Sequence, residues 1–166
     1  ASTPVFLVRA TAHPPAVPWS LRRIMVPLDG SALAERALPT AIDLATRALA
    51  ELLLFHAVSP PARYLTELAP FRRSSSTIEF PLPEHQQALQ RLQAVAERWH
   101  DQGITILPVV TSGEPAQEIV GQAARQHVDL IVLATHGYGG LRRWALGSVA
   151  DKLLHAAEAP LLLMRN

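Results

Sequence analysis

The sequence predicts an α/β protein: a single doubly wound, Rossmann-like domain whose five-stranded parallel sheet carries about four helices on both faces. Two observations predict this fold class. Segments with the apolar spacing of a helix alternate with strand-like segments along the 166 residues. The strand-like segments are continuous apolar runs, which are typical of parallel strands buried on both faces. Right-handed crossovers between such strands then place helices on both sides of the sheet.

The first strand and helix follow an N-terminal extension, residues 1–22, which contains four prolines and shows no steady period. We expect this extension to lie on the surface or to be disordered. The apolar run 23–29 predicts the first strand, and residues 30–48 carry apolar side chains spaced for one helical face. Ser31 is a candidate N-cap. Pro39 lies inside this pattern and should kink the helix, because it removes a donor and crowds the preceding turn.

The middle of the domain, which spans residues 23–166, contains a long interruption. Residues 51–58 predict the second strand, and residues 84–102 have the spacing of the second helix. Between them, residues 59–83 are rich in proline and serine. We interpret them as an insertion loop, because a structureless segment of that length inside a compact domain is often a lid or disordered.

The C-terminal half completes the alternation of strands and helices. Its predicted elements are a strand at 104–110, a helix at 113–127, a strand at 128–134, a helix at 148–157 and a strand at 159–165. Pro115 is near the start of its helix, where proline is tolerated. The last strand is apolar, so at a sheet edge it would need a partner.

Two loops are predicted to face one crevice. Doubly wound sheets bind ligands beyond the carboxyl ends of their strands, near the switch in strand order. The loop from Leu28 to Ser31 follows the first strand, and the glycine-rich loop from Ala134 to Ser148 follows the fourth. If these strands are neighbours, the two loops lie on either side of a ligand site.

The glycine-rich loop fits neither the Walker A pattern nor the dinucleotide fingerprint. It still offers Gly137, where the backbone can approach a ligand closely, and a helix start at Gly147 and Ser148 with unpaired N–H groups. Together these groups predict a clamp for a polyphosphate. The alternative is that Ser148 and Asp151 form only a capping box.

The segments RIMVPLDGSALAERAL and LATHGYGGLRRWALGSVADKLLHAAEAPLLLM resemble the universal stress protein family. The ATP-binding class of this family carries G-x2-G-x9-G-[ST]. That motif maps onto Ala134, Gly137, Gly147 and Ser148, so alanine replaces the first glycine. The resemblance covers about residues 22–58 and 103–166.

The resemblance implies a site for ATP, or a related adenine nucleotide, with Mg²⁺. The matching positions are Pro27, Leu28 and Asp29 at the adenine and ribose, Ala57 against adenine, Leu133 and Ala134 beside the ligand, and Gly137, Gly147, Ser148 and Val149 at the phosphates. Asp29 can accept hydrogen bonds from ribose hydroxyls; a turn before Gly30 is its structural alternative. His136 and Arg142 are further candidates for phosphate contacts, with loop shaping and a solvated surface as the alternatives. No side chain is assigned to the metal, because Mg²⁺ keeps several waters and would be held mainly by phosphate oxygens.

The composition excludes several classes of function. The chain contains no cysteine, which removes disulfides, thiol catalysis and cysteine-ligated metals. A net charge of +1 gives no case for nucleic acid or an anionic membrane as a partner. No H-E-x-x-H or G-x-S-x-G motif is present. The apolar run Val5 to Val8 is too short for a signal peptide or a membrane span, so we expect a cytoplasmic protein.

Three functions remain open. The leading hypothesis is a cytoplasmic, nucleotide-dependent stress-response module that is not an enzyme. The second is a slow ATPase or phosphotransferase in the same crevice, which lacks a visible base or nucleophile. The third is an interaction protein without nucleotide, which Ala134 favours. We also expect a homodimer through the C-terminal strand, residues 160–165, as the resemblance implies; the alternative is that the N-terminal extension covers this strand.

Overall fold

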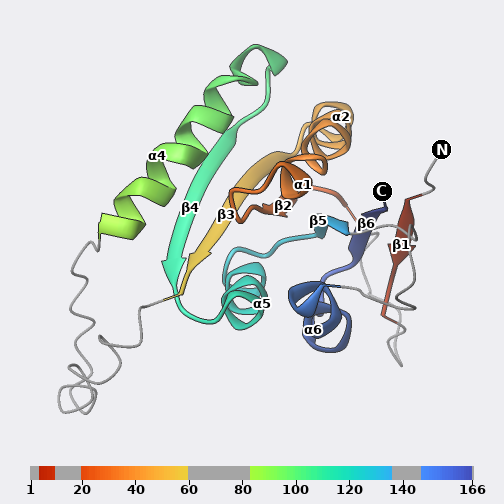
Figure 1. Ribbon diagram of the computed structural model, residues 1–166. Helices are drawn as coiled ribbons and strands as arrows, with labels where there is room; N and C mark the ends of the chain where they lie inside the picture. Colours follow the sequence, from red (N-terminus) through yellow and green to blue (C-terminus); the bar gives the residue numbers. More distant parts are fainter. Residues whose placement is uncertain (1–3, 10–19, 60–82, 136–146, 166) are drawn as a thin grey trace.

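One six-stranded sheet organises the part of the chain that the computed structural model describes, residues 4–9, 20–59, 83–135 and 147–165. Its order is β1-β6-β5-β2-β3-β4 (Figure 1). The strands are β1 (Val5–Leu7), β2 (Arg23–Pro27), β3 (Glu51–Val58), β4 (Ile106–Ser112), β5 (Leu130–Thr135) and β6 (Leu161–Arg165). β2 to β6 are parallel, and β1 is antiparallel to β6. The predicted five-stranded parallel sheet is therefore present, with one further strand at its edge.

Helices cover both faces of the sheet (Figure 1). They are α1 (Ala32–Glu35), α2 (Leu38–Ala48), α4 (Pro83–Glu97), α5 (Pro115–Arg125) and α6 (Ser148–Ala156), with a short 3₁₀ turn at His100–Gln102. Buried side chains of α2 and α4 form one core cluster with the sheet, and those of α5 and α6 form a second cluster on the opposite face. This three-layer arrangement confirms the predicted doubly wound fold.

The predicted first helix is two helices. α1 ends at Glu35, and α2 begins at Leu38 with Pro39 in its first turn, where a missing N–H costs no helical hydrogen bond. The proline thus separates two helices rather than bending one. Ser31 is the predicted N-cap of α1, and its Oγ accepts a hydrogen bond from Ala34 N–H at 3.1 Å.

β1 corrects the prediction for the sheet edge. The sequence indicated five strands, but residues of the N-terminal extension form a sixth, which pairs Val5 with Leu163 and Leu7 with Leu161. Arg9 follows β1 and donates to the His155 carbonyl oxygen at 2.6 Å, at the end of α6. Three residues are too few to show a strand period, which is why the pattern missed them. The extension, rather than a second copy of the chain, therefore pairs with β6; homodimerisation itself stays a prediction.

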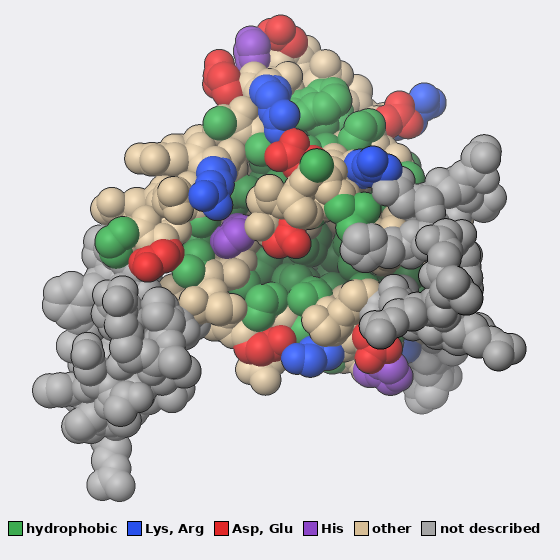
Figure 2. Space-filling model, viewed as in Figure 1, with side chains coloured by type: hydrophobic (Ala, Val, Ile, Leu, Met, Phe, Trp, Pro, Cys, Tyr) green, Lys and Arg blue, Asp and Glu red, His purple; other side chains and the backbone are tan. Residues whose placement is uncertain are grey.

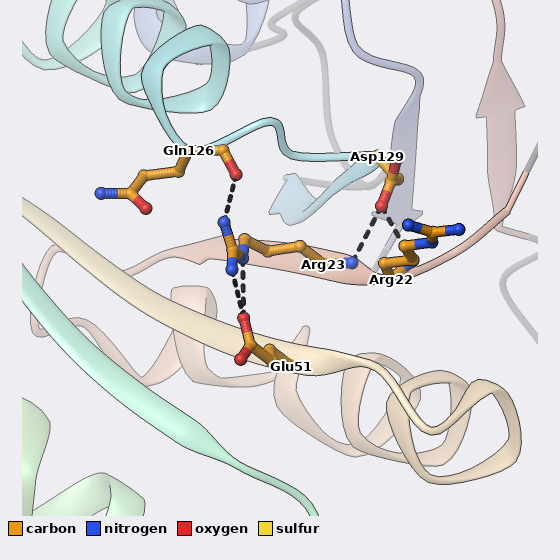
Figure 3. Close-up of polar contacts among 5 residues, drawn as sticks. All are labelled: Arg22, Arg23, Glu51, Gln126 and Asp129. Carbon is orange, nitrogen blue, oxygen red and sulfur yellow. Dashed lines mark hydrogen bonds and ion pairs between the residues drawn. The ribbon is translucent and has the colours of Figure 1, made fainter.

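A polar cluster joins three segments at the amino ends of the central strands (Figure 3). Arg23 at the start of β2 forms an ion pair with Glu51 of β3 and donates to the carbonyl oxygen of Gln126. Asp129 Oδ2 accepts hydrogen bonds from the backbone N–H groups of Arg22 and Arg23, at 2.8 and 2.9 Å. These contacts fix the strands at the end of the sheet opposite the predicted ligand site.

Candidate functional site

A crevice of about 410 Å³ lies at the carboxyl ends of β2, β3 and β5. Figure 2 shows it as a hollow lined by hydrophobic side chains. β2 and β5 are neighbours, so the strand order reverses here, as doubly wound binding sites require. The lining residues are Pro27, Leu28, Asp29, Leu33, Ala34, Phe55, Ala57, Pro115, Ile119, Leu133, Ala134, Thr135, Gly147, Ser148, Val149 and Ala150.

The loop after β2 presents the one ionisable side chain among these lining residues, Asp29. Asp29 Oδ1 accepts a hydrogen bond from Ser31 N–H at 2.9 Å, and Gly30 makes the turn between them with a φ of +84°. Burial raises the pKa of Asp29, but hydrogen bonds from Ser31 and the electrostatic attraction of nearby His56 together lower it by more, so the net pKa lies below its usual value. The carboxylate is therefore ionised at neutral pH and acts only as an acceptor.

The other end of the crevice is the start of α6. Gly147 is its N-cap, and Asp151 N–H donates to the Gly147 carbonyl oxygen at 3.0 Å. No side chain of the described residues caps this helix, so the alternative capping box of Ser148 with Asp151 is not formed. The first backbone N–H groups of the helix and the positive end of its dipole would attract an anion placed at this position. A Cβ on Gly147 would meet no atom of the described residues within 4 Å, so these residues leave the approach to the helix start open.

Apolar side chains line the crevice between these two ends. Phe55 and Ala57 come from β3, and Ile119 comes from α5. Such a surface favours a flat, weakly polar group, with orientation set by a few polar groups at the ends. The crevice thus combines an apolar centre, an acceptor on one side and a helix N-terminus on the other.

Ala134 lines the crevice, but its side chain lies on the face of the sheet that α2 and α4 cover. It packs against the cluster that α2 and α4 cover, whereas Leu133 belongs to the cluster of α5 and α6. Gly147 and Ser148 begin α6, on the face of Leu133. Because successive side chains of a strand alternate between faces, the Ala134 methyl group points away from the face that carries α6.

An ion pair connects the start of α5 with α6 beside the crevice. Glu114 caps α5 by accepting from Gln117 N–H, and its Oε1 lies 2.8 Å from Lys152 Nζ of α6. The hydrogen bond from Lys152 holds the pKa of Glu114 below its usual value, and the bond from Gln117 acts in the same direction. This contact links the start of α5 to the second turn of α6, and the first turns of both helices line the crevice.

The model of the universal stress protein family matches residues 20–165. The chain belongs to the universal stress protein family. A universal stress protein of Methanocaldococcus jannaschii is 33% identical over 151 residues, which cover 87% of this chain and 82% of that protein. One of Bacillus subtilis is 31% identical over 153 residues, which cover 86% of this chain and 98% of that protein.

Solved universal stress proteins share the fold. One, determined in complex with cAMP, superposes with a TM-score of 0.64 at 21% identity and covers 86% of this chain and 96% of its own. Another, from Arabidopsis thaliana with AMP bound, has a TM-score of 0.59 at 18% identity and covers 87% of this chain and 92% of its own. At these identities the likeness shows the fold alone.

The structure brings nine of the twelve predicted site residues to one crevice. They are Pro27, Leu28, Asp29, Ala57, Leu133, Ala134, Gly147, Ser148 and Val149. The other three, His136, Gly137 and Arg142, lie outside the described residues. Sequence reasoning missed part of the lining supplied by α1, α5, α6 and the strands β3 and β5: Leu33, Ala34, Phe55, Pro115, Ile119, Thr135 and Ala150. These are ordinary core residue types, so only their position in the fold identifies them.

In the described ranges, no group of three or more His, Asp or Glu side chains is arranged to hold a metal ion. Within the same ranges, no helix is both long and apolar enough to cross a membrane.

Proposed function

We propose that this protein binds ATP, or a related adenine nucleotide, with Mg²⁺ in the crevice between the loops after β2 and β5. It would act in the cytoplasm as a nucleotide-dependent module of the stress response. The observation that carries the proposal is the composition of the crevice. One carboxylate, an apolar centre and the start of a nine-residue helix match the ribose, base and phosphates of a nucleotide.

In this arrangement the base packs against Ala57 and its apolar neighbours. The ribose hydroxyls donate to Asp29, which is ionised and fixed by Ser31. The phosphates meet the N–H groups from Gly147 to Val149. Mg²⁺ is assigned to phosphate oxygens and water, and no protein ligand is proposed for it. The AMP and cAMP complexes of two family members support an adenine nucleotide as the ligand class.

Ala134 favours the competing function, an interaction protein without nucleotide, because the ATP-binding motif has glycine there. The direction of its methyl group, toward the cluster of α2 and α4, supports the nucleotide-binding proposal instead. Slow ATP hydrolysis is the second alternative. Asp29 is the one carboxylate among the described lining residues, and the proposal assigns it to the ribose.

Release of bound nucleotide and thermal unfolding test the proposal. Denaturing the purified protein should release an adenine nucleotide, identified by chromatography. ATP with Mg²⁺ should raise the melting temperature, because a ligand that binds only the native state stabilises it. No released nucleotide and no shift at millimolar ATP would contradict the proposal. Phosphate release above the blank that is lost in Asp29→Ala would favour the enzyme.

Gly147→Val should abolish the shift while the fold persists. An added Cβ meets no atom of the described residues within 4 Å, and the valine side chain would occupy the approach to the α6 N–H groups. Losing a favourable N-cap residue costs about 1 kcal/mol. Gly147→Ala is the matched control, because it removes the same cap preference with less bulk at the phosphates. If ATP raised the melting temperature of Gly147→Val as much as that of the unmodified protein, the start of α6 would not be part of the binding site.

A further inference from the structure

The loop that carries Asp29 is ordered internally by two contacts. Ser31 N–H donates to Asp29 Oδ1 at 2.9 Å, and Ala34 N–H donates to Ser31 Oγ at 3.1 Å. Both contacts join residues of the same short segment. They fix the shape of the turn and its junction with α1, but neither connects the turn to the neighbouring strand.

β3 supplies that connection. Leu28 N–H donates to the Phe55 carbonyl oxygen at 2.8 Å, which continues the parallel pairing of β2 with β3 one residue beyond β2. The Leu28 carbonyl oxygen then accepts a hydrogen bond from His56 Nδ1 at 2.6 Å. Because a carbonyl oxygen only accepts, Nδ1 carries the proton in this contact. Leu28, the residue immediately before Asp29, is therefore held to β3 through both of its backbone polar groups.

His56 itself lies on the other side of the loop. It is half-buried and lines a second groove with Gly30, Arg91 and other side chains of α4. Its strand neighbours Phe55 and Ala57 line the nucleotide crevice instead, as the alternation of a strand requires. His56 therefore acts on the crevice through the loop and not by touching a ligand there.

We propose that His56 is a positioning residue for the ribose-binding carboxylate, an inference that rests on the proposed nucleotide-binding function. Its imidazole anchors the peptide that precedes Asp29 and so sets the distance from the carboxylate to the ribose hydroxyls. A hydrogen-bonding site discriminates strongly only when its groups are held in the productive geometry. Loss of the anchor is expected to weaken the preference for a ribose that carries its hydroxyls, with a smaller effect on the base and phosphates.

The test compares ATP with 2′,3′-dideoxy-ATP, which lacks both ribose hydroxyls. Dissociation constants are measured with Mg²⁺ for the unmodified protein, Asp29→Asn, His56→Leu, His56→Gln and His56→Asn, and thermal unfolding verifies that each variant is folded. Asparagine places an amide N–H at the same number of bonds from Cα as His Nδ1, and glutamine places it one bond farther. His56→Asn is therefore the conservative variant, and His56→Gln is its matched control.

We expect the unmodified protein to bind ATP about tenfold or more tightly than the dideoxy nucleotide. The reason is that the ribose hydroxyls of ATP donate hydrogen bonds to a charged group, and such bonds are stronger than those between neutral groups. Asp29→Asn should remove most of that preference. His56→Leu and His56→Gln should lower it several-fold, and His56→Asn should retain it. If His56→Leu does not fold, His56→Gln carries the comparison.

Two results would overturn the inference while leaving the proposed function intact. In one, ATP binds and Asp29→Asn loses the preference, but His56→Leu and His56→Gln keep it. In the other, His56→Asn loses as much preference as His56→Gln, which would indicate a packing role. If the unmodified protein bound both nucleotides with equal affinity, Asp29 would not recognise the ribose hydroxyls, and the inference about His56 would fail with it. Binding of neither nucleotide would instead reject the proposed function itself, on which the inference depends.

Discussion

Ala134 shows how the direction of a single side chain bears on function. In the sequence, it is the departure from the glycine of the ATP-binding motif, and a methyl group at that point raises the question of crowding. In the structure, the methyl group packs against the cluster under α2 and α4, while Gly147 and Ser148 begin a helix on the opposite face. The alanine at this position therefore concerns the core more than the proposed phosphate site.

Ala134→Gly is expected to lower stability without tightening ATP binding. Glycine in a strand interior costs roughly 0.5–1 kcal/mol relative to alanine, because it adds backbone freedom to the unfolded chain. Chemical denaturation measures the stability, and calorimetric titration with ATP and Mg²⁺ measures the affinity. An increase in affinity of about tenfold would show that the methyl group does crowd the ligand.

Among the elements, α5 and α6 are coupled at the rim by Glu114 and Lys152. The pKa of Glu114 is lowered in the folded state from its ordinary value of 4.5. A group with a lowered folded pKa stabilises the protein above its unfolded pKa, and this contribution disappears as pH falls through the folded pKa. The contact is exposed, so its contribution is small and sensitive to salt.

Glu114→Gln isolates the charge in this contact, since the amide oxygen can still accept from Gln117 N–H. The variant should melt below the unmodified protein at pH 7. The difference should shrink once the pH is below 4.5 and vanish as Glu114 becomes protonated in the folded state. Thermal unfolding of both proteins at pH 7 and again below pH 4.5 measures this difference in melting temperature. A difference that is independent of pH would mean that packing, not charge, explains the variant.

The helices and strands also show which parts of the fold and the site the sequence predicts. The alternation of apolar segments predicts β2 to β6 and the helices, and Pro39 predicts a kink where the structure has a break between α1 and α2. Residues with a local signal, such as Asp29 before a glycine and Gly147 before a helix, can be placed in a site from the motif. His56 carries no such signal, because its proposed role depends on a contact with the Leu28 carbonyl oxygen, 28 residues away in the chain. β1 is too short to have a period, and its pairing depends on the edge that β6 offers.

At the scale of the whole molecule, the two edges of the sheet are closed in different ways. β4 carries Pro108, which has no N–H to offer to another strand. β6 is apolar and is covered by β1, while Arg9 binds the end of α6. Residues 4–9 precede the matched family domain, which begins at residue 20. The segment before the domain thus takes the edge through which the sequence predicts a homodimer.

Replacement of Leu7 by aspartate tests whether β1 controls this edge. Leu7 is half-buried and packs on the cluster of α5 and α6, whereas Phe6 is 51% exposed, so Phe6→Asp is the matched control. Leu7→Asp should release β1, cost about 1–2 kcal/mol of stability and leave the apolar edge of β6 open to a second copy. Denaturation and sedimentation velocity should then show a less stable, more associated protein for Leu7→Asp alone. If the unmodified chain is already a dimer and Leu7→Asp does not change its mass, the dimer uses a surface other than β6, because an interface on that edge depends on whether β1 is in place.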